Sequence, residues 1–236
     1  MNENAQFIFN NKKLYDDYDS ILMYLDIGYP ELNRIAHTVP FMNGVYDFTD
    51  LYGNATWSER TITVHIRHKS GELGRSMLNG YYDNISLWLL SQPMSKLKFD
   101  HIRGYFTGRV TGFSTREAYN ILGYIEVTFT CHPFREWEEY EGNNLWDPFC
   151  FETDIMQDTK FEVNGKKTVT VHNLSATSVI PLVICNDTMK VTKGGRNFTF
   201  EQGETNNPIF ELAPGANTMT ITGYGEIEFK FKRMVI

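Results

Sequence analysis

The sequence predicts a mainly β protein of 236 residues, with an N-terminal α+β domain followed by a C-terminal β-sandwich. Three observations lead to this fold class. Short strand-like runs broken by tight turns recur along the whole chain. One segment in the first half has helical periodicity instead. From about residue 158 onward, only strand and turn signals remain, at the spacing typical of a sandwich.

In the first half, the alternation of apolar and polar residues is clearest at 60–67, where Ile62, Val64 and Ile66 share one face of a half-buried strand. Asn10-Asn11 can supply the turn of the strand at 6–12, and Asn43-Gly44 is a strong hairpin-turn signal. Asp16-Asp17 is expected to form an acidic turn. The strand signals of this half fall at residues 6–12, 22–25, 38–48, 60–67, 96–99, 105–113 and 121–131.

A helix is expected over residues 76–91. Its apolar positions recur at spacings of four, four, three and one, which places them on one face, and Pro93 prevents continuation. These positions are Met77, Tyr81, Ile85, Trp88 and Leu89. Strands, one helix and further strands indicate an α+β domain, β-sandwich-like with one helix, over residues 1–135.

Residues 136–157 are expected to form an acidic linker or surface arm. Between Glu136 and Asp154 there are seven acidic residues and no basic one, and turn formers fall inside this stretch. Its aromatic residues, Trp137 and Trp146 among them, imply that it packs onto another surface.

Residues 158–236 are expected to form the β-sandwich. Glycine-containing turns separate short runs of β-forming residues, and the last run alternates charged and apolar side chains, as in a strand with one solvated face. The runs are 168–172, 179–185, 189–192, 198–200, 209–212, 218–222 and 227–232.

Charge and composition exclude several classes of function. The net charge is −7, with −1 over residues 1–135 and −6 over 136–236, so neither half supplies the basic footprint that tight nucleic-acid binding needs. The three cysteines form no CxxC pair, which favours synthesis in a reducing compartment. We expect no signal peptide, because the polar N-terminus lacks a basic n-region and an apolar h-region. We expect no membrane span, because no apolar run approaches roughly 20 residues.

No constellation for catalysis, metal binding or cofactor binding is predicted. The histidines and cysteines are scattered, and the neighbours Cys131 and His132 point to opposite faces of a strand. No GxSxG or HExxH motif occurs. Paired acids such as Asp16-Asp17 keep glycoside hydrolysis as an alternative, because that reaction uses two carboxylates, although adjacent acids more often form turns. Binding of a carbohydrate also stays open, with Trp137, Trp146, Tyr140 and Tyr224 as candidate sugar contacts.

Taken together, the order and spacing of short motifs resemble the distal tail protein (Dit) family of long-tailed phages that infect Gram-positive bacteria. Phe41-Met42 departs from the Gly-Arg that many relatives carry after the proline. The motifs are Phe9-Asn10-Asn11-Lys12 with Asp16-Asp17-Tyr18, Val39-Pro40, Asn43-Gly44, Asp47, Arg60, Phe99-Asp100, Tyr105-Phe106, Gly108-Arg109-Val110, Phe129, Cys131, Pro133-Phe134, and Leu212 to Thr218 followed by Gly223.

The resemblance implies a non-enzymatic virion protein, made in the host bacterial cytoplasm and located at the tail tip or baseplate. Residues 1–135 would form a hexameric ring that adapts to the tail tube, and residues 158–236 would be a galectin-like sandwich that holds the adhesion apparatus. The partners implied are the tail tube protein, a tail-associated tip protein and a receptor-binding protein, with DNA passing through the lumen unbound.

Arginine is enriched at protein interfaces, so Arg60, Arg103 and Arg109 are candidate subunit contacts, together with Trp137 and Trp146. Each arginine is equally compatible with a local ion pair on a solvated strand. The alternative function is a carbohydrate-binding module for cell-wall glycans, contacting sugar through Trp146, Tyr140 and Tyr224.

Overall fold

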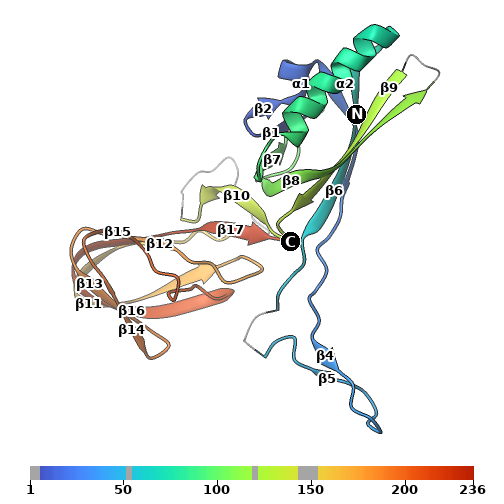
Figure 1. The fold of residues 1–236 in the computed structure, drawn as a ribbon. Helices are drawn as coiled ribbons and strands as arrows, with labels where there is room; N and C mark the ends of the chain where they lie inside the picture. The colour runs from blue at the N-terminus through green and yellow to red at the C-terminus, as the bar shows by residue number, and fades with distance from the viewer. Residues whose placement is uncertain (1–5, 52–54, 119–121, 143–153) are drawn as a thin grey trace. The chain divides into compact units, whose positions relative to one another are not determined.

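A computed structural model describes residues 6–51, 55–118, 122–142 and 154–236. The chain divides into two compact units, Met1–Arg135 with Ile236, and Glu136–Val235. Both are built mainly of antiparallel strands (Figure 1), which confirms the predicted fold class.

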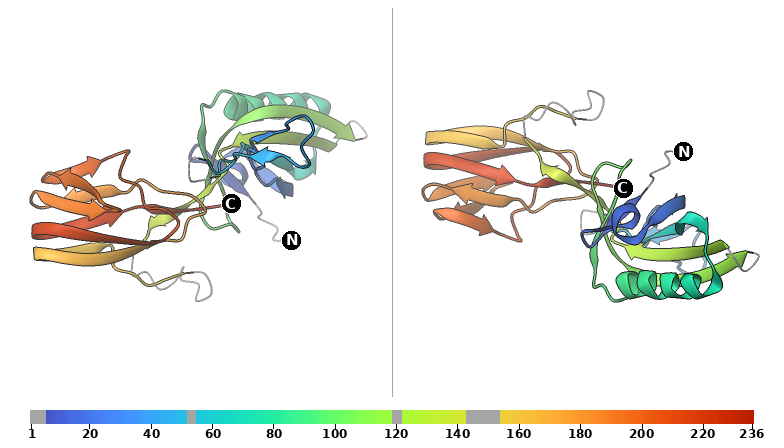
Figure 2. Two further views of the ribbon diagram at one scale, coloured as in Figure 1. Left: turned by 90° about the horizontal axis from the view of Figure 1, so that it is seen from below. Right: turned by 90° about the horizontal axis from the view of Figure 1, so that it is seen from above.

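Unit 1 is a seven-stranded sheet in the order β2-β1-β7-β8-β9-β6-β3. The helix α2 lies along one face of this sheet (Figures 1 and 2), and the apolar side chains between the two layers form its core. The elements are β1 (Phe7–Phe9), β2 (Lys12–Lys13), α1 (Leu14–Tyr18), β3 (Ser20–Ile27), β4 (Ala36–His37), β5 (Tyr46–Asp47), β6 (Arg60–Glu72), α2 (Arg75–Leu90), β7 (Ser95–Phe99), β8 (Phe106–Ala118) and β9 (Leu122–Cys131).

Two local expectations for unit 1 are confirmed. Ile62, Val64 and Ile66 of β6 are fully buried, as the alternating pattern predicts. Asn10 and Asn11 turn the chain between β1 and β2 with φ of 50° and 62°, a conformation that asparagine tolerates better than most residues.

The expected helix is present, but the assignment of Met77 to its buried face is wrong. Met77 is 68% exposed, and Leu78 lies on the buried face with Tyr81, Ile85 and Trp88. Starting from Leu78, the spacings are three, four and three, which follow the helical repeat better than spacings counted from Met77.

Two expected turns also differ. Asp16 and Asp17 belong to the short helix α1. The hairpin at 38–48 is not closed by a two-residue Asn43-Gly44 turn, because His37 pairs with Tyr46 and residues 38–45 all lie in the connection. A two-residue turn needs strands that continue to pair up to it, and here the ladder stops after two residue pairs.

Unit 2 wraps its strands around a second core. The long strand β16 organises it: residues 215–228 pair with β11, 220–222 with β13 and 227–230 with β12. The elements are β10 (Arg135–Tyr140), β11 (Lys160–Asn173), β12 (Leu182–Cys185), β13 (Met189–Lys193), β14 (Arg196–Phe200), β15 (Gly203–Asn206), β16 (Gly215–Lys230) and β17 (Lys232–Val235).

The strand expected at residues 209–212 of unit 2 is wrong. Residues 209–212 form no strand, and only Leu212 makes an isolated bridge, to Val179. The strand lies at β15 instead, where Leu182↔Asn206 to Cys185↔Gly203 pair with β12. β15 carries no apolar residue, so its sequence lacks a strand pattern, whereas Phe210 and Leu212 are buried without being in a ladder.

The described parts of the acidic segment 136–157 are not a linker. Residues 135–140 form β10, which pairs with β17, and the amide of Glu141 donates to the carbonyl of Phe231 at 2.9 Å. Arg233 is buried between Glu141 and Asp154, with nitrogen–oxygen distances of 2.8 Å to each. Because this cation is about 80 residues away in sequence, the local charge pattern gave no sign of it.

Candidate assembly site

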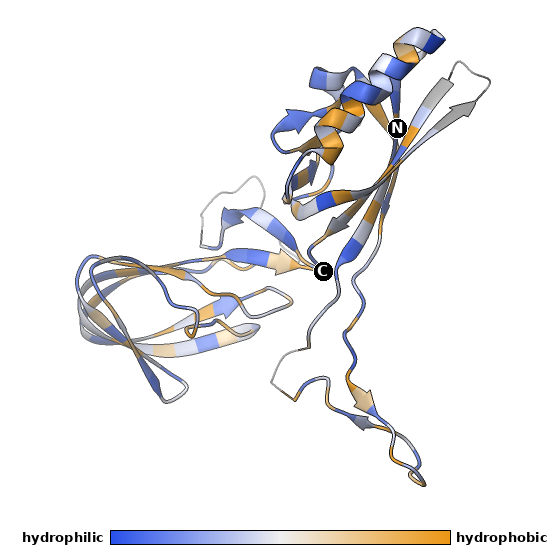
Figure 3. Ribbon diagram, in the orientation of Figure 1, coloured by the Kyte–Doolittle hydropathy of each residue, from blue (hydrophilic) through white to orange (hydrophobic). Residues whose placement is uncertain are grey.

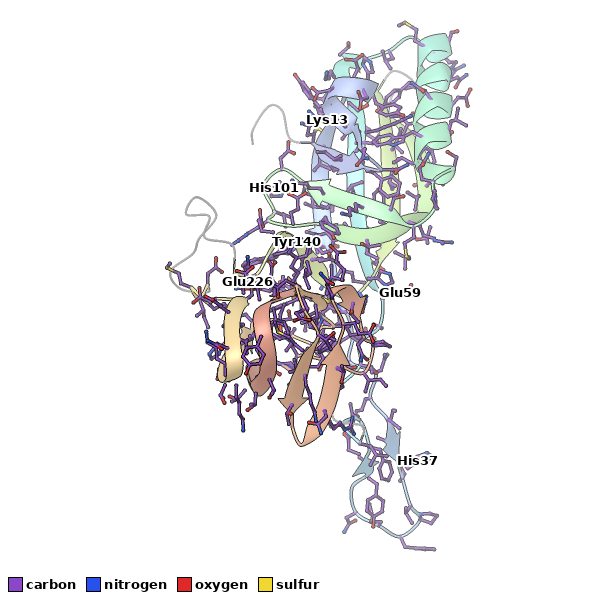
Figure 4. The ribbon with its side chains drawn as sticks, turned by 90° about the vertical axis from the view of Figure 1, so that its left-hand side faces the viewer. Lys13, His37, Glu59, His101, Tyr140 and Glu226 are labelled. Carbon is purple, nitrogen blue, oxygen red and sulfur yellow. The ribbon has the colours of Figure 1, made fainter. Side chains whose placement is uncertain are left out.

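A long extension, residues 28–59, leaves unit 1 at the end of β3 and returns at the start of β6. It projects away from the sheet (Figure 1), with His37 in its outer part and Glu59 where it rejoins the sheet (Figure 4). Every residue from Glu31 to Phe41 is exposed, and the core of unit 1 contains none of its side chains. The extension therefore adds no side chain to the hydrophobic core of unit 1, and the amide of Gly28 at its root donates to the carbonyl of Thr61.

The extension nevertheless carries many large apolar side chains (Figure 3). Tyr29 is 78% exposed and Phe41 is fully exposed. Single exposed apolar residues are ordinary, but a run of them on one projecting element marks an interaction surface. The set is Tyr29, Leu32, Ile35, Val39, Phe41, Val45, Tyr46, Phe48 and Leu51.

Local hydrogen bonds hold the extension in a defined ribbon. The amide of Phe48 donates to the carbonyl of Ile35 at 2.7 Å, and Arg34 Nε donates to the carboxylate of Asp47 at 3.0 Å. Thr49 donates to Asp47 through its hydroxyl and its amide. These bonds from Thr49, with the one from Arg34, lower the pKa of Asp47 to about 2. The surface is thus ordered before any partner arrives.

The tip of the extension presents an aromatic ring in a costly conformation. Phe41 has a φ of 67°, and a positive φ is uncommon for a bulky residue. Such outliers cost on the order of 1–3 kcal/mol and concentrate at functional positions. The sequence departure at Phe41-Met42 therefore places an exposed hydrophobic residue at the outermost turn.

The root of the extension holds a buried arginine. Arg60 is the first residue of β6, is 3% exposed, and lies over the ring of Phe106 at 5.3 Å from its centroid. Burial lowers the pKa of its guanidinium, and the nearby charge of Arg135 acts in the same direction. Within the described residues, Nε and Nη2 of Arg60 and Nε of Arg135 are buried without a hydrogen-bond partner.

The two edges of the unit 1 sheet differ. β2 is a two-residue strand of lysines, a common protection against further pairing. β3 has eight residues, pairs with β6 on one side, and has no strand on its other side in the described part of the chain. β3 leads directly into the extension, so an open edge and the apolar ribbon are continuous.

The structure describes four of the five residues expected at subunit contacts, three in unit 1 and one in unit 2. Arg60 lies at the root, Arg103 is half-buried between β7 and β8, and Arg109 is exposed on β8. In unit 2, Trp137 is buried with the guanidinium of Arg233 3.9 Å from its ring centroid. Trp146 lies outside the described residues.

Two of the candidate glycan contacts, Tyr140 and Tyr224, lie in unit 2. Tyr140 is 47% exposed and has the ammonium of Lys232 5.3 Å from its ring centroid. Tyr224 is 68% exposed on β16.

The described part of the chain contains no group of three or more His, Cys, Asp or Glu able to hold a metal ion. Cys131 and Cys185 are free and buried, as expected, and burial raises their pKa to about 12 and about 11. Both are therefore thiols near neutral pH, a poor state for a nucleophile. None of the described helices is both long enough and apolar enough to cross a bilayer.

Two functional features were missed from the sequence. The extension was read as a simple hairpin, although apolar residues without helical or alternating period between Tyr29 and Leu51 were a usable signal. The contact of Arg233 with the acidic segment had no sequence signal at all.

Comparison with known proteins gives one kind of match. No protein-family description matches the chain, and no curated protein matches it in sequence. Among solved structures, it matches the Dit (gp 19.1) protein of phage SPP1, described as a paradigm of the hub adsorption apparatus in phages infecting Gram-positive bacteria. The TM-score is 0.66 at 12% identity, over 97% of this chain and 98% of that one, so the two share a fold.

Proposed function

We propose that this chain is a structural phage tail protein whose copies form a hexameric hub ring at the tail tip. The ring would join the tail tube to a tail-associated tip protein and a receptor-binding protein, and DNA would pass through its lumen without specific binding. The fold shared with the SPP1 hub protein over nearly the full length of both chains supports this role.

The observation that carries the proposal is the extension of residues 28–59. It is apolar, and none of its side chains belongs to the hydrophobic core of its own unit, so we infer that another molecule covers it. If it packs on a different face of the next copy, the contact is heterologous, and a heterologous contact that repeats by rotation closes into a ring. The open edge of β3 can contribute to the same contact by adding a strand across subunits.

The hub role places residues 1–135 in the ring and the galectin-like sandwich of residues 158–236 outside it, facing the adhesion proteins. It is proposed ahead of the carbohydrate-binding module, because the fold shared with the SPP1 hub protein supports the hub. No catalytic step is proposed, and the location that follows is the virion tail tip, after synthesis in the host cytoplasm.

Electron microscopy of the purified protein tests the proposal. Class averages should show a closed ring with six-fold symmetry and a central channel wide enough for duplex DNA. Particles of one 27.4 kDa chain, or open filaments, would contradict it. A glycan array gives the opposing reading: a saturable hit lost in Trp146→Ala would favour the carbohydrate-binding module.

A further inference from the structure

The guanidinium of Arg60 is buried and has no anionic partner within residues 6–51, 55–118, 122–142 and 154–236. The side chain is 3% exposed, and Nε and Nη2 have no acceptor in the described residues. Its one favourable contact is the ring of Phe106, at 5.3 Å from the centroid. Buried polar groups in native proteins are almost always paired, so an orphaned buried cation requires an explanation.

A second cation makes the arrangement more costly. Arg135 is close enough to act on the charge of Arg60, and its own Nε is buried without a partner in the described ranges. Besides Arg135, the groups that act on the charge of Arg60 are the thiol of Cys131 and the phenol of Tyr29, and neither is a carboxylate. Two like charges, partly removed from water and without a carboxylate, form a site that favours an anion.

The extension carries the complementary charge. Between residues 28 and 59 it has four carboxylates and one basic residue, Arg34, which is paired with Asp47. The other three carboxylates, Glu31, Asp50 and Glu59, are exposed and make no ion pair in the described part of the chain. Each copy therefore has an acidic projecting element and an unneutralised cationic root.

We propose that Arg60 and Arg135 receive a carboxylate from the extension of a second copy, so that each ring contact joins an acidic extension to a cationic root. This inference rests on the proposed ring and identifies its polar contact. A carboxylate bound by a guanidinium forms paired, directional hydrogen bonds, which set the position of the extension, while its apolar side chains supply the buried area.

Arg60→Met tests the inference, because methionine keeps the unbranched stem and removes the charge. Subunit stability is measured at a dilution where the wild type is dissociated, and ring affinity by sedimentation. We expect the unfolding midpoint to stay unchanged or to rise, since an uncompensated buried cation is removed. The dissociation constant should rise at least about tenfold, as expected for a buried charge pair. Arg196→Met, at an exposed arginine on β14 of unit 2, should change neither quantity.

The partner carboxylate is identified by combining Arg60→Met with Glu31→Gln, Asp50→Asn or Glu59→Gln. One of these substitutions should weaken the ring in the wild-type background and have no further effect beside Arg60→Met. A fall in subunit stability with unchanged ring affinity would overturn the inference and leave the ring intact. A wild type that never assembles would overturn both. If inorganic phosphate stabilises the wild-type subunit but not Arg60→Met, and the ring is unaffected, the pair is a small-anion site and the inter-copy contact is wrong.

Discussion

Shortening the extension tests whether it is needed for the proposed ring or for the folding of its own subunit. The change removes residues 36–47, that is β4, β5 and the connection between them, and joins Ile35 to Phe48 through two glycines. The amide of Phe48 already donates to the carbonyl of Ile35 at 2.7 Å, so the new ends lie side by side. The deleted segment contributes no residue to the core of unit 1, and we expect the unfolding midpoint of the subunit to be unchanged.

The loss of ring affinity follows from the apolar surface removed. Val39, Phe41, Val45 and Tyr46 expose together on the order of 400 Å², taking roughly 150–250 Å² for a full aromatic side chain. At about 25 cal/mol per Å², complete burial is worth roughly 10 kcal/mol per contact. Ordering and incomplete burial offset most of this, and a net loss of about 3 kcal/mol corresponds to more than a hundredfold in the dissociation constant.

Sedimentation velocity over a range of concentrations measures the effect. Ile209→Ser is the control, because Ile209 is a large apolar residue that is 66% exposed but lies in unit 2, and it should leave both the midpoint and the ring unchanged. If the shortened variant still forms rings at the concentrations at which the wild type does, the extension is not needed for assembly. If its subunit unfolds, the extension is needed for folding, and either result contradicts the expectation.

Three further outcomes are expected. Arg233→Met should destabilise unit 2 by about 3–5 kcal/mol in thermal unfolding, because two buried carboxylates lose their counter-ion; a smaller change than that of an exposed lysine variant would contradict this. Gly108→Ala should lower the free energy of unfolding by about 1–3 kcal/mol, because the added Cβ would lie 2.3 Å from the sulfur of Cys131. Gly80→Ala in α2 should raise it by up to about 1 kcal/mol, because the added Cβ meets open space and alanine favours the helix. Equal effects of the two variants would be inconsistent with the packing. The pKa of Asp47 in the folded protein lies below its ordinary value, so its hydrogen bonds to Thr49 persist above about pH 4 and weaken as the pH falls toward 2. The NMR chemical shift of the Thr49 amide should therefore stay constant from pH 7 to about 3. A titration midpoint near pH 4 would count against the hydrogen bonds between Asp47, Thr49 and Arg34.

Much of the fold could be predicted where the signal is local. The alternation at Ile62, Val64 and Ile66 marks a strand because one face of it is buried, and the stop at Pro93 bounds α2 because proline cannot continue a helix. β15 could not be found this way, because its polar residues are held by pairing with β12, a partner that the local sequence does not reveal.

The candidate site was less accessible to sequence reasoning. Arg60 was selected because arginine is common at interfaces, but its burial without an anion depends on Phe106 and Arg135, which come from other strands. The extension looked like a hairpin because Asn43-Gly44 matches a turn motif, whereas the exposure of its apolar residues depends on their having no sheet to cover. Exposure is a property of the whole fold.

The central claim is that identical copies close into a ring through the extension. The most direct measurement is the mass of the particle in solution, for the purified chain alone and after mixing with the tail tube protein. We expect an assembly of about 164 kDa, six copies of the 27.4 kDa chain, that is lost when residues 36–47 are removed. A single-chain mass at every concentration, with and without the tube protein, would contradict it.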